Sequence, residues 1–483
     1  MNTPPTQEEK ISLDELCSNY KPFELDFITP DPKGDVRAYL DLYLMYESRD
    51  PEWHEVQAHI FNYFNQLLVD YRSNKISEEQ LLIALNFPEV QAIGLGYCKE
   101  GVKGKGTHLE RAGLIKEAIF DNTEIAEFGI EALAKTSIQI EGIGPDLLSD
   151  LVGNFALFNL IEYTKEQVKT FNLKTISVSL PNGYDFNTRK WVPAIKVDLP
   201  HYENGGYRLL VPRHISRKMP ILSTSEFYNG CLKYVLQNEE LSREKILSTI
   251  GKEPKVKIKD IEKSLESKYG SVHLAARIIA QERPELVKGY AENPHQFDSK
   301  RRPRKQKIVW QTYINEIKAL PTGSKSSREY SLLLLKIFKV IYGENLLRGK
   351  IETTSHGEIY RYDLNFLNAS TTAFFNVLRN QQIKAGLIII EAKNYGLTNV
   401  SNKEFNQSLA YTIKNGRDFI FLIQRDGVTE DDIKKSKEIY LRHRCIVLPL
   451  GDNDIVKMIE GRKDSEDTFD IFLNERLQQI LSA

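Results

Sequence analysis

The sequence predicts an α/β protein, in which a C-terminal mixed sheet flanked by helices follows a helical and α+β N-terminal region. Two observations support this. From residue 330 onward, short apolar runs alternate with amphipathic helical segments, which is the spacing of a sheet covered by helices. In the first 135 residues, apolar side chains instead recur at three- and four-residue intervals, the period of a helix. A chain of 483 residues is long enough for about three compact units at ~150 residues each.

The composition excludes several classes of protein. Hydrophobic residues make up 41% and charged residues 27%, which is typical of a soluble globular chain. Lys and Arg number 65 against 66 Asp and Glu, so any affinity for nucleic acid must come from local patches. The four cysteines are widely spaced and predict neither a disulfide framework nor a zinc site. Without a targeting segment or a long apolar run, we expect a cytoplasmic protein with no membrane contact.

The N-terminal half divides into two predicted domains. Residues 1–135 are expected to be mostly helical, and residues 136–245 are expected to form an α+β recognition or assembly domain. The expected helices cover residues 55–71, 77–85 and 109–120, and the expected strands cover residues 175–180, 191–199 and 207–211.

A lysine-rich helical connector is expected over residues 246–320, with Ile258, Ile261, Leu265 and Tyr269 on one stripe. The connector contains a run with six basic residues in eight, at residues 300–307. A second basic patch lies outside the connector, near residue 215. Such charges suit sequence-independent contact with phosphates, although a solvated linker is the alternative reading of the run. These nucleic-acid-binding candidates are Lys300, Arg301, Arg302, Arg304, Lys305, Lys307, Arg213, Arg217 and Lys218.

The C-terminal domain is expected over residues 321–483. A long apolar helix opens it, a helical excursion is inserted at residues 369–384, and two strand and helix pairs follow a buried aliphatic strand. The expected helices cover residues 330–342, 402–414 and 431–441, and the expected strands cover residues 346–353, 359–366, 387–390, 419–423 and 445–450.

Three charged residues in this domain are candidates for catalysis. Side chains alternate along a strand, so Asp363 lies opposite Tyr362, Leu364 and Phe366. Glu391 and Lys393 share one face at the end of the next predicted strand, where the sheet is expected to meet solvent. If the two strands are neighbours, two carboxylates and an amine converge. That grouping suits Mg²⁺ (or Mn²⁺) and the hydrolysis of a phosphodiester, because hard oxygen ligands hold the ion and a lysine stabilises developing negative charge.

The region of residues 329–462 resembles the catalytic domain of the PD-(D/E)xK nuclease superfamily, the restriction-endonuclease-like fold, in its Mrr/RecB-like branch. The shared motifs are Asp363, the E-x-K-N-Y sequence from Glu391 to Tyr395, and Gln-x-x-x-Tyr from Gln407 to Tyr411. Two features depart from the pattern: Tyr362 stands where relatives often have proline, and 27 residues separate Asp363 from Glu391.

The resemblance implies a role for each matching residue. Asp363 and Glu391 would bind the metal, Lys393 would serve the attacking water, and Gln407 with Tyr411 would support the site and substrate. Glu329, at the start of the first core helix, matches a position where many relatives carry an additional acid.

The expected function is that of a Mg²⁺-dependent endonuclease acting on DNA. Cleavage of both strands requires two sites, so we expect a homodimer or a larger assembly. Residues 1–320 are expected to recognise a target, a partner subunit or an activating ligand. Residues 144–164 are similar to segments that accompany such nuclease domains in prokaryotic proteins, often in antiviral defence, which implies an effector role. The alternatives are an inactive nucleic-acid-binding or scaffold protein, and a nuclease that cleaves RNA.

Overall fold

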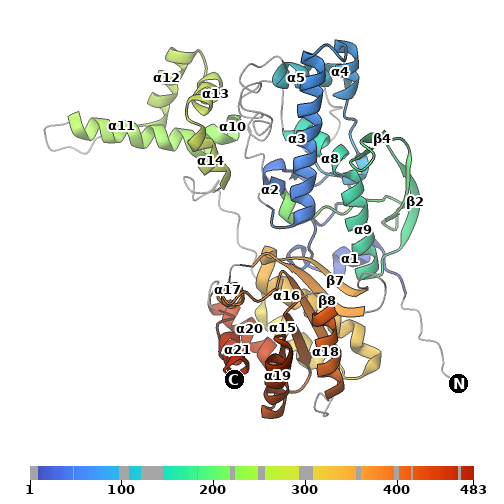
Figure 1. The fold of residues 1–483 in the computed structure, drawn as a ribbon. Helices are drawn as coiled ribbons and strands as arrows, with labels where there is room; N and C mark the ends of the chain where they lie inside the picture. Colours follow the sequence, from blue (N-terminus) through green and yellow to red (C-terminus); the bar gives the residue numbers. More distant parts are fainter. Residues whose placement is uncertain are drawn as a thin grey trace.

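The chain folds into three parts in the computed structural model (Figure 1). They are an N-terminal unit up to residue 217, a helical arm from residue 224 to 292, and a C-terminal unit built on a five-stranded sheet. The structure describes residues 9–46, 48–96, 108–120, 145–181, 183–217, 224–247, 256–292, 308–354, 361–370, 372–395, 402–414, 417–465 and 469–482.

The helices of the N-terminal unit follow the predicted apolar spacing. The long helix α3 buries Trp53, Ile60 and Phe64 along one side, and the Asp50 side chain caps its first turn. Ser77 forms a capping box at the start of α4, which agrees with the predicted start of that helix. The helical elements are α1 (Leu13–Asn19), η1 (Pro22–Glu24), α2 (Leu42–Tyr46), α3 (Pro51–Arg72), α4 (Glu78–Ala84), η2 (Gln91–Ile93), α5 (His108–Ile119), α8 (Pro145–Phe155), α9 (Leu157–Phe171) and η4 (Arg213–Ile215).

The strands of this unit form three small antiparallel pairs, which are β1 with β6, β2 with β5, and β3 with β4. The strand predicted over residues 191–199 is divided in two, because Ala194 has a positive φ of 52° that interrupts the extended backbone. The strands are β1 (Tyr39–Leu40), β2 (Thr175–Leu180), β3 (Gly183–Asp185), β4 (Lys190–Val192), β5 (Ile195–Pro200) and β6 (Ser216–Arg217).

The prediction of a strand over residues 207–211 is wrong. Tyr207 forms only an isolated bridge with His201, and the next three backbone donors bond to three different elements instead of one strand. Arg208 donates to the carbonyl of Pro200 and Leu209 to that of Ala92. Leu210 donates to the side-chain oxygen of Thr164. The apolar residues of this segment are buried although they lie in a loop and not in a sheet. Alternation along the sequence does not distinguish a buried loop from a buried strand.

The helical arm has a core of its own. Ile261 and Leu265 of the predicted stripe are buried in it, as expected from their spacing. Gly230 allows a close approach in this core, because a Cβ there would lie 2.5 Å from the hydroxyl oxygen of Tyr290. The elements are α10 (Thr224–Phe227), the π-helix η5 (Tyr228–Leu232), α11 (Lys233–Leu247), α12 (Ile258–Tyr269), α13 (Val272–Glu282) and α14 (Pro284–Glu292).

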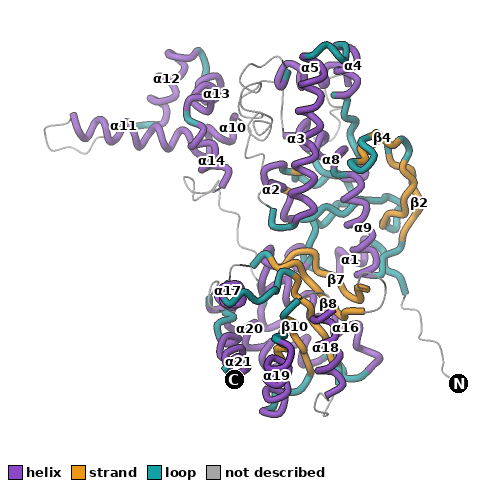
Figure 2. The backbone as a smooth tube through the Cα atoms, viewed as in Figure 1, coloured by secondary structure: helices purple, strands orange, loops and turns teal. Residues whose placement is uncertain are grey.

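The C-terminal unit contains the predicted mixed sheet, whose strands are orange near the labels β7, β8 and β10 in Figure 2. The strand order is β11-β10-β9-β8-β7. The strands β7, β8 and β9 are antiparallel neighbours, and β9, β10 and β11 are parallel. The pairing of β8 with β9, on which the predicted site depends, is therefore confirmed. The strands are β7 (Leu346–Thr354), β8 (Arg361–Asn368), β9 (Leu387–Lys393), β10 (Phe419–Gln424) and β11 (Ile446–Gly451).

Helices cover both faces of this sheet. On one face, α16, α17, α20 and α21 pack against a core that includes Ile388 and Ile390 of β9. On the other face, α18 and α19 enclose a smaller core around Ile389. The helical elements are α15 (Trp310–Ala319), η7 (Ser324–Ser326), α16 (Ser327–Tyr342), η8 (Gly343–Asn345), α17 (Ala373–Asn380), α18 (Asn402–Lys414), α19 (Glu430–His443), α20 (Asp452–Asp464) and α21 (Phe472–Leu481).

The N-terminal and C-terminal units share one continuous hydrophobic core. The boundary predicted at residue 135 separates parts of this core, and α15, predicted to belong to the connector, packs against α16 and α20 of the C-terminal unit. The helical arm does not share this core, because its buried apolar residues form a cluster of their own. Among the described helices, none is both long enough and apolar enough to cross a bilayer.

A buried ion network joins the two units beside β7. The Asp26 carboxylate accepts hydrogen bonds from the Lys339 ammonium of α16 and from the backbone N–H of Arg348. Arg348 lies in a bulge of β7 with a φ of 53°, and its guanidinium bonds to Glu52 and Glu166 of the N-terminal unit. These bonds fix the edge strand of the sheet to the N-terminal unit.

We predict that Asp26→Ala lowers the free energy of unfolding by about 3 kcal/mol, because the substitution leaves the Lys339 ammonium buried without its carboxylate. Urea unfolding followed by circular dichroism measures the change. The matched control is Asp35→Ala, an exposed aspartate of the same segment, which should stay within about 0.5 kcal/mol of the parent. Equal stability of the two variants would contradict the prediction.

Candidate active site

Three of the predicted residues meet where the β8–β9 ladder ends. The paired register stops at Leu364 and Ile390, and one residue beyond it the Asp363 carboxylate accepts a hydrogen bond of 2.9 Å from the backbone N–H of Ala392. A side-chain oxygen thus binds a β9 amide beyond the last paired residues. This bond places Asp363 beside Glu391, as the sequence predicted.

Glu391 lies deeper than predicted. Its side chain is only 2% exposed, because α18 and α19 cover the face of the sheet that was expected to meet solvent. One carboxylate oxygen, Oε1, accepts a hydrogen bond of 2.5 Å from the Lys393 ammonium. The other oxygen, Oε2, is buried without a hydrogen-bond partner. A buried carboxylate oxygen without a donor has an open coordination position.

Burial and charge shift the titration of this pair. Burial, followed by repulsion from Asp363, raises the pKa of Glu391 to about 7. Burial opposes the charge of the Lys393 ammonium, yet attraction to Glu391 and the hydrogen bond between them raise the pKa of Lys393 above its ordinary value. The Lys393 ammonium therefore stays charged at neutral pH, while the Glu391 carboxyl titrates near pH 7.

The helix α18 brings Gln407 and Tyr411 to the site. The Lys393 ammonium lies 3.5 Å from Gln407 Oε1, and the Gln407 amide donates a hydrogen bond of 2.6 Å to the Tyr411 hydroxyl. The two side chains share a helix face because they are four residues apart. The edge of the Tyr362 ring packs on Tyr411 with the ring centroids 5.2 Å apart, so Tyr362 is buried as expected but on the α18 side of the sheet.

A polar network around Asn394 and Arg425 lies behind the site, and the sequence did not indicate it. The Asn394 amide donates to the carbonyls of Pro321 and Gly323 at 3.2 and 2.8 Å. Its side-chain oxygen accepts a hydrogen bond of 2.8 Å from Arg425, which also binds Asp452. Asn394 belonged to the recognised motif, but nothing in the sequence around Arg425 pointed to this role.

Glu404 was also not identified from the sequence. It lies in the first turn of α18, and its charge contributes to the raised pKa of Glu391. Acidic residues are common in the first turn of helices because they interact with the helix dipole, so its position in the sequence was not distinctive.

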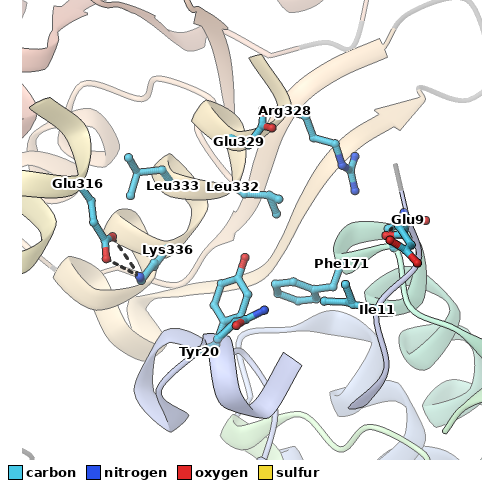
Figure 3. A pocket seen from close by; sticks show the side chains of 12 residues that line it. Glu9, Ile11, Tyr20, Phe171, Glu316, Arg328, Glu329, Leu332, Leu333 and Lys336 are labelled. Atoms are coloured by element: carbon cyan, nitrogen blue, oxygen red, sulfur yellow. Dashed lines mark hydrogen bonds and ion pairs between the residues drawn. The ribbon is translucent and has the colours of Figure 1, made fainter. Parts of the chain in front are cut away.

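The structure does not place Glu329 with these residues. Glu329 is exposed on α16 and lines a pocket of about 350 Å³ between α16 and the N-terminal unit. In Figure 3, the rings of Tyr20 and Phe171 lie toward this pocket, and Lys336 pairs with Glu316 at one side. None of Asp363, Glu391 and Lys393 lines the pocket. A position on the first core helix was therefore not sufficient to bring an acid to the site.

Two of the predicted nucleic-acid contacts are corrected by the structure. The Arg213 guanidinium donates to the backbone carbonyls of Leu25 and Phe27, and Arg217 pairs with Asp41 in a largely buried contact. Both guanidinium groups bond to partners within the N-terminal unit, so they do not form the predicted surface patch. Lys218 and the basic run, comprising Lys300, Arg301, Arg302, Arg304, Lys305 and Lys307, lie outside the described residues.

The donor set fits a hard divalent cation with few protein ligands. Among the described residues, no group of three or more His, Cys, Asp and Glu side chains is arranged to hold a metal ion. Asp363 and Glu391 offer two carboxylates, and Glu391 Oε2 has no competing donor. Mg²⁺ is commonly bound through one or two carboxylates and retains several waters, so these two residues meet its minimum requirement.

Part of the chain matches a known protein-family model. Residues 19–223 match a domain of unknown function, DUF8370. The matched range contains most of the N-terminal unit and ends one residue before α10. No curated protein and no solved structure matches the chain.

We predict that Glu391→Gln stabilises the metal-free protein at alkaline pH. The folded-state pKa near 7 exceeds the ordinary value of 4.5, so the folded chain retains a proton that the unfolded chain loses. The stability present below pH 4.5 is therefore lost as the pH rises to 7, by about 3 kcal/mol. Glutamine resembles the protonated carboxyl and avoids this loss.

Urea unfolding in EDTA at pH 5 and pH 8 measures the effect. The free energies of the variant and wild type should be similar at pH 5 and diverge at pH 8, with the variant more stable. The control Glu438→Gln changes a glutamate whose side chain is 68% exposed and should show no such divergence. A variant less stable than wild type at pH 8 would contradict the prediction.

Proposed function

We propose that the protein is a Mg²⁺-dependent nuclease that hydrolyses phosphodiester bonds of DNA. The observation that carries the proposal is the convergence of Asp363, Glu391 and Lys393, with Glu391 Oε2 buried and without a donor. Structural carboxylates in a protein interior are normally satisfied by hydrogen bonds, since an unpaired buried oxygen is costly. A buried carboxylate oxygen that is left without a hydrogen bond is typical of a ligand-binding site.

Each residue has a defined part in the proposed reaction. Asp363 and Glu391 would hold the Mg²⁺, which when bound neutralises phosphate charge and makes a coordinated water more acidic. The Lys393 ammonium donates hydrogen bonds to the attacking water and stabilises the negative charge that develops on the phosphate. Gln407 accepts a hydrogen bond from that ammonium and is itself oriented by Tyr411, so the pair keeps Lys393 directed toward the site.

The chain order of the C-terminal unit supports the proposal. It runs from α16 through three antiparallel strands, β7, β8 and β9, with α17 inserted between β8 and β9, and then to α18 and the parallel strand β10. This order and the positions of the motifs are those expected of a restriction-endonuclease-like domain of the PD-(D/E)xK superfamily. Fold similarity by itself does not establish activity, so the proposal rests on the site.

The biological role follows from the same resemblance. We propose an effector of prokaryotic antiviral defence that acts as a homodimer or larger assembly, with the region of residues 1–320 recognising a target, a partner subunit or an activating ligand. Because the N-terminal unit is fixed to β7 and shares the core of the C-terminal unit, an event at the N-terminal unit has a direct structural connection to the sheet that carries the site.

We predict that the purified protein cleaves plasmid DNA in the presence of Mg²⁺ or Mn²⁺. Asp363→Asn, Glu391→Gln and Lys393→Ala should each lower the cleavage rate at least about 100-fold, because each removes a charge that contacts the reacting groups. Agarose gels of supercoiled, nicked and linear plasmid give the rates, and ligation of the ends without kinase treatment checks for 5′-phosphates.

Glu438→Gln provides the matched control and should cleave at the wild-type rate. A parallel digestion of single-stranded RNA distinguishes the RNA-cleaving alternative. Wild-type rates in all three site variants would refute the assignment of the site. Binding of DNA without cleavage of either nucleic acid would favour the scaffold alternative.

A further inference from the structure

An exposed aromatic ring lies next to the candidate active site. Tyr395 is 46% exposed, and among the described residues the only other aromatic side chain with comparable exposure is Tyr46, at 47%. Most other described aromatic rings are at least partly buried, as is usual for such large apolar groups. Tyr46 packs on the ring of His54, whereas no ring contact of Tyr395 with another aromatic residue is formed within the described part of the chain.

The backbone beneath Tyr395 is firmly held although its ring is exposed. The preceding residue, Asn394, bonds through its side chain to two carbonyls of the loop before α16 and to Arg425. Its backbone carbonyl accepts a hydrogen bond of 2.7 Å from Gly323. The chain therefore leaves β9 along a fixed path, so the base of the Tyr395 side chain has a defined position while its ring faces solvent.

Tyr395 is also close to the reacting groups along the chain. Tyr395 is two residues beyond Lys393 and four beyond Glu391, at the end of the strand that carries both. Two residues of chain span at most about 7 Å, so the Tyr395 backbone lies near that of Lys393. A nucleotide chain bound with a phosphate at Lys393 would therefore extend past a residue whose ring is exposed.

We propose that Tyr395 is a specificity-determining residue that stacks on an unpaired nucleobase next to the scissile phosphate. This inference rests on the proposed nuclease function and defines its substrate class as a single strand or a locally opened duplex. In an intact duplex both faces of each base are already stacked on neighbours, so the ring has no free face to cover. A base that is unstacked offers one, and aromatic stacking on it does not depend on sequence.

Binding in the non-cleaving Glu391→Gln background tests the inference. The probes are a fluorescein-labelled single-stranded oligodeoxynucleotide and the same oligonucleotide with abasic sites in place of its nucleobases. Fluorescence anisotropy in Mg²⁺ gives the dissociation constants. Tyr395→Leu retains an apolar side chain without the ring, and Tyr395→Phe retains the ring without the hydroxyl. Tyr46→Leu is the matched control, because it removes an equally exposed aromatic ring far away in the sequence.

Tyr395→Leu should weaken binding of the base-containing strand about 5- to 100-fold and leave binding of the abasic strand unchanged. Tyr395→Phe should bind both probes like the parent, and Tyr46→Leu should have no effect. Thermal unfolding of each variant should match the parent, since the residue is exposed. Equal loss on both probes, no loss on either, or failure of Tyr395→Phe to restore binding would overturn the stacking role.

Cleavage by the otherwise wild-type protein separates this inference from the function on which it rests. If wild type and Tyr395→Leu both cleave DNA and the Leu variant discriminates bases from abasic sites as wild type does, only the stacking role is refuted. If wild type neither binds nor cleaves any nucleic acid, the nuclease function fails and the stacking role fails with it.

Discussion

The carboxyl end of β9 is held by polar bonds on two sides, and the candidate site depends on this constraint. On one side the Asp363 carboxylate binds the Ala392 amide beyond the last paired residues of the ladder. On the other side Asn394 is bonded to the loop before α16 and to Arg425. Glu391 and Lys393 lie between these two anchors. Their side chains therefore start from fixed backbone positions, as preorganised chemistry requires.

The same arrangement makes the ionised form of Glu391 unfavourable in the folded protein. Glu391 is buried near Asp363, and one of its oxygens has no donor, so its charged form is disfavoured in the folded protein. A cost of this kind must be offset by stable structure elsewhere. The large core shared by the N-terminal and C-terminal units supplies this stability. The ion network of Asp26, Lys339 and Arg348 at their junction adds to it.

The shared core also changes how the N-terminal unit is understood. Most of the region that matches DUF8370 is packed into the body that carries the candidate site, and the edge strand β7 is bonded to it directly. The helical arm differs, because it buries its apolar residues in a core of its own. The N-terminal unit is thus part of the structural support of the sheet, while the arm has the internal packing of a separate module.

Local sequence patterns determined much of the fold. The spacing of apolar residues predicted α3, α12 and α16, and the buried aliphatic run predicted β9, because each pattern expresses the geometry of a single element. The same reasoning failed at residues 207–211, where the backbone donors bond to β5, to η2 and to a side chain of α9. Alternation reports that a face is buried, but it does not report what buries it.

The residue types of the site were likewise present in the sequence, since Asp363, Glu391, Lys393, Gln407 and Tyr411 form a recognisable motif. Only the tertiary structure decided how deeply Glu391 is buried, that Glu329 lies apart from it, and that Arg213 and Arg217 bond within the interior. The reason is that burial and charge pairing depend on contacts between segments far apart in the chain. A motif fixes which side chains are available along one strand, and the packing of other elements around it fixes what those side chains can do.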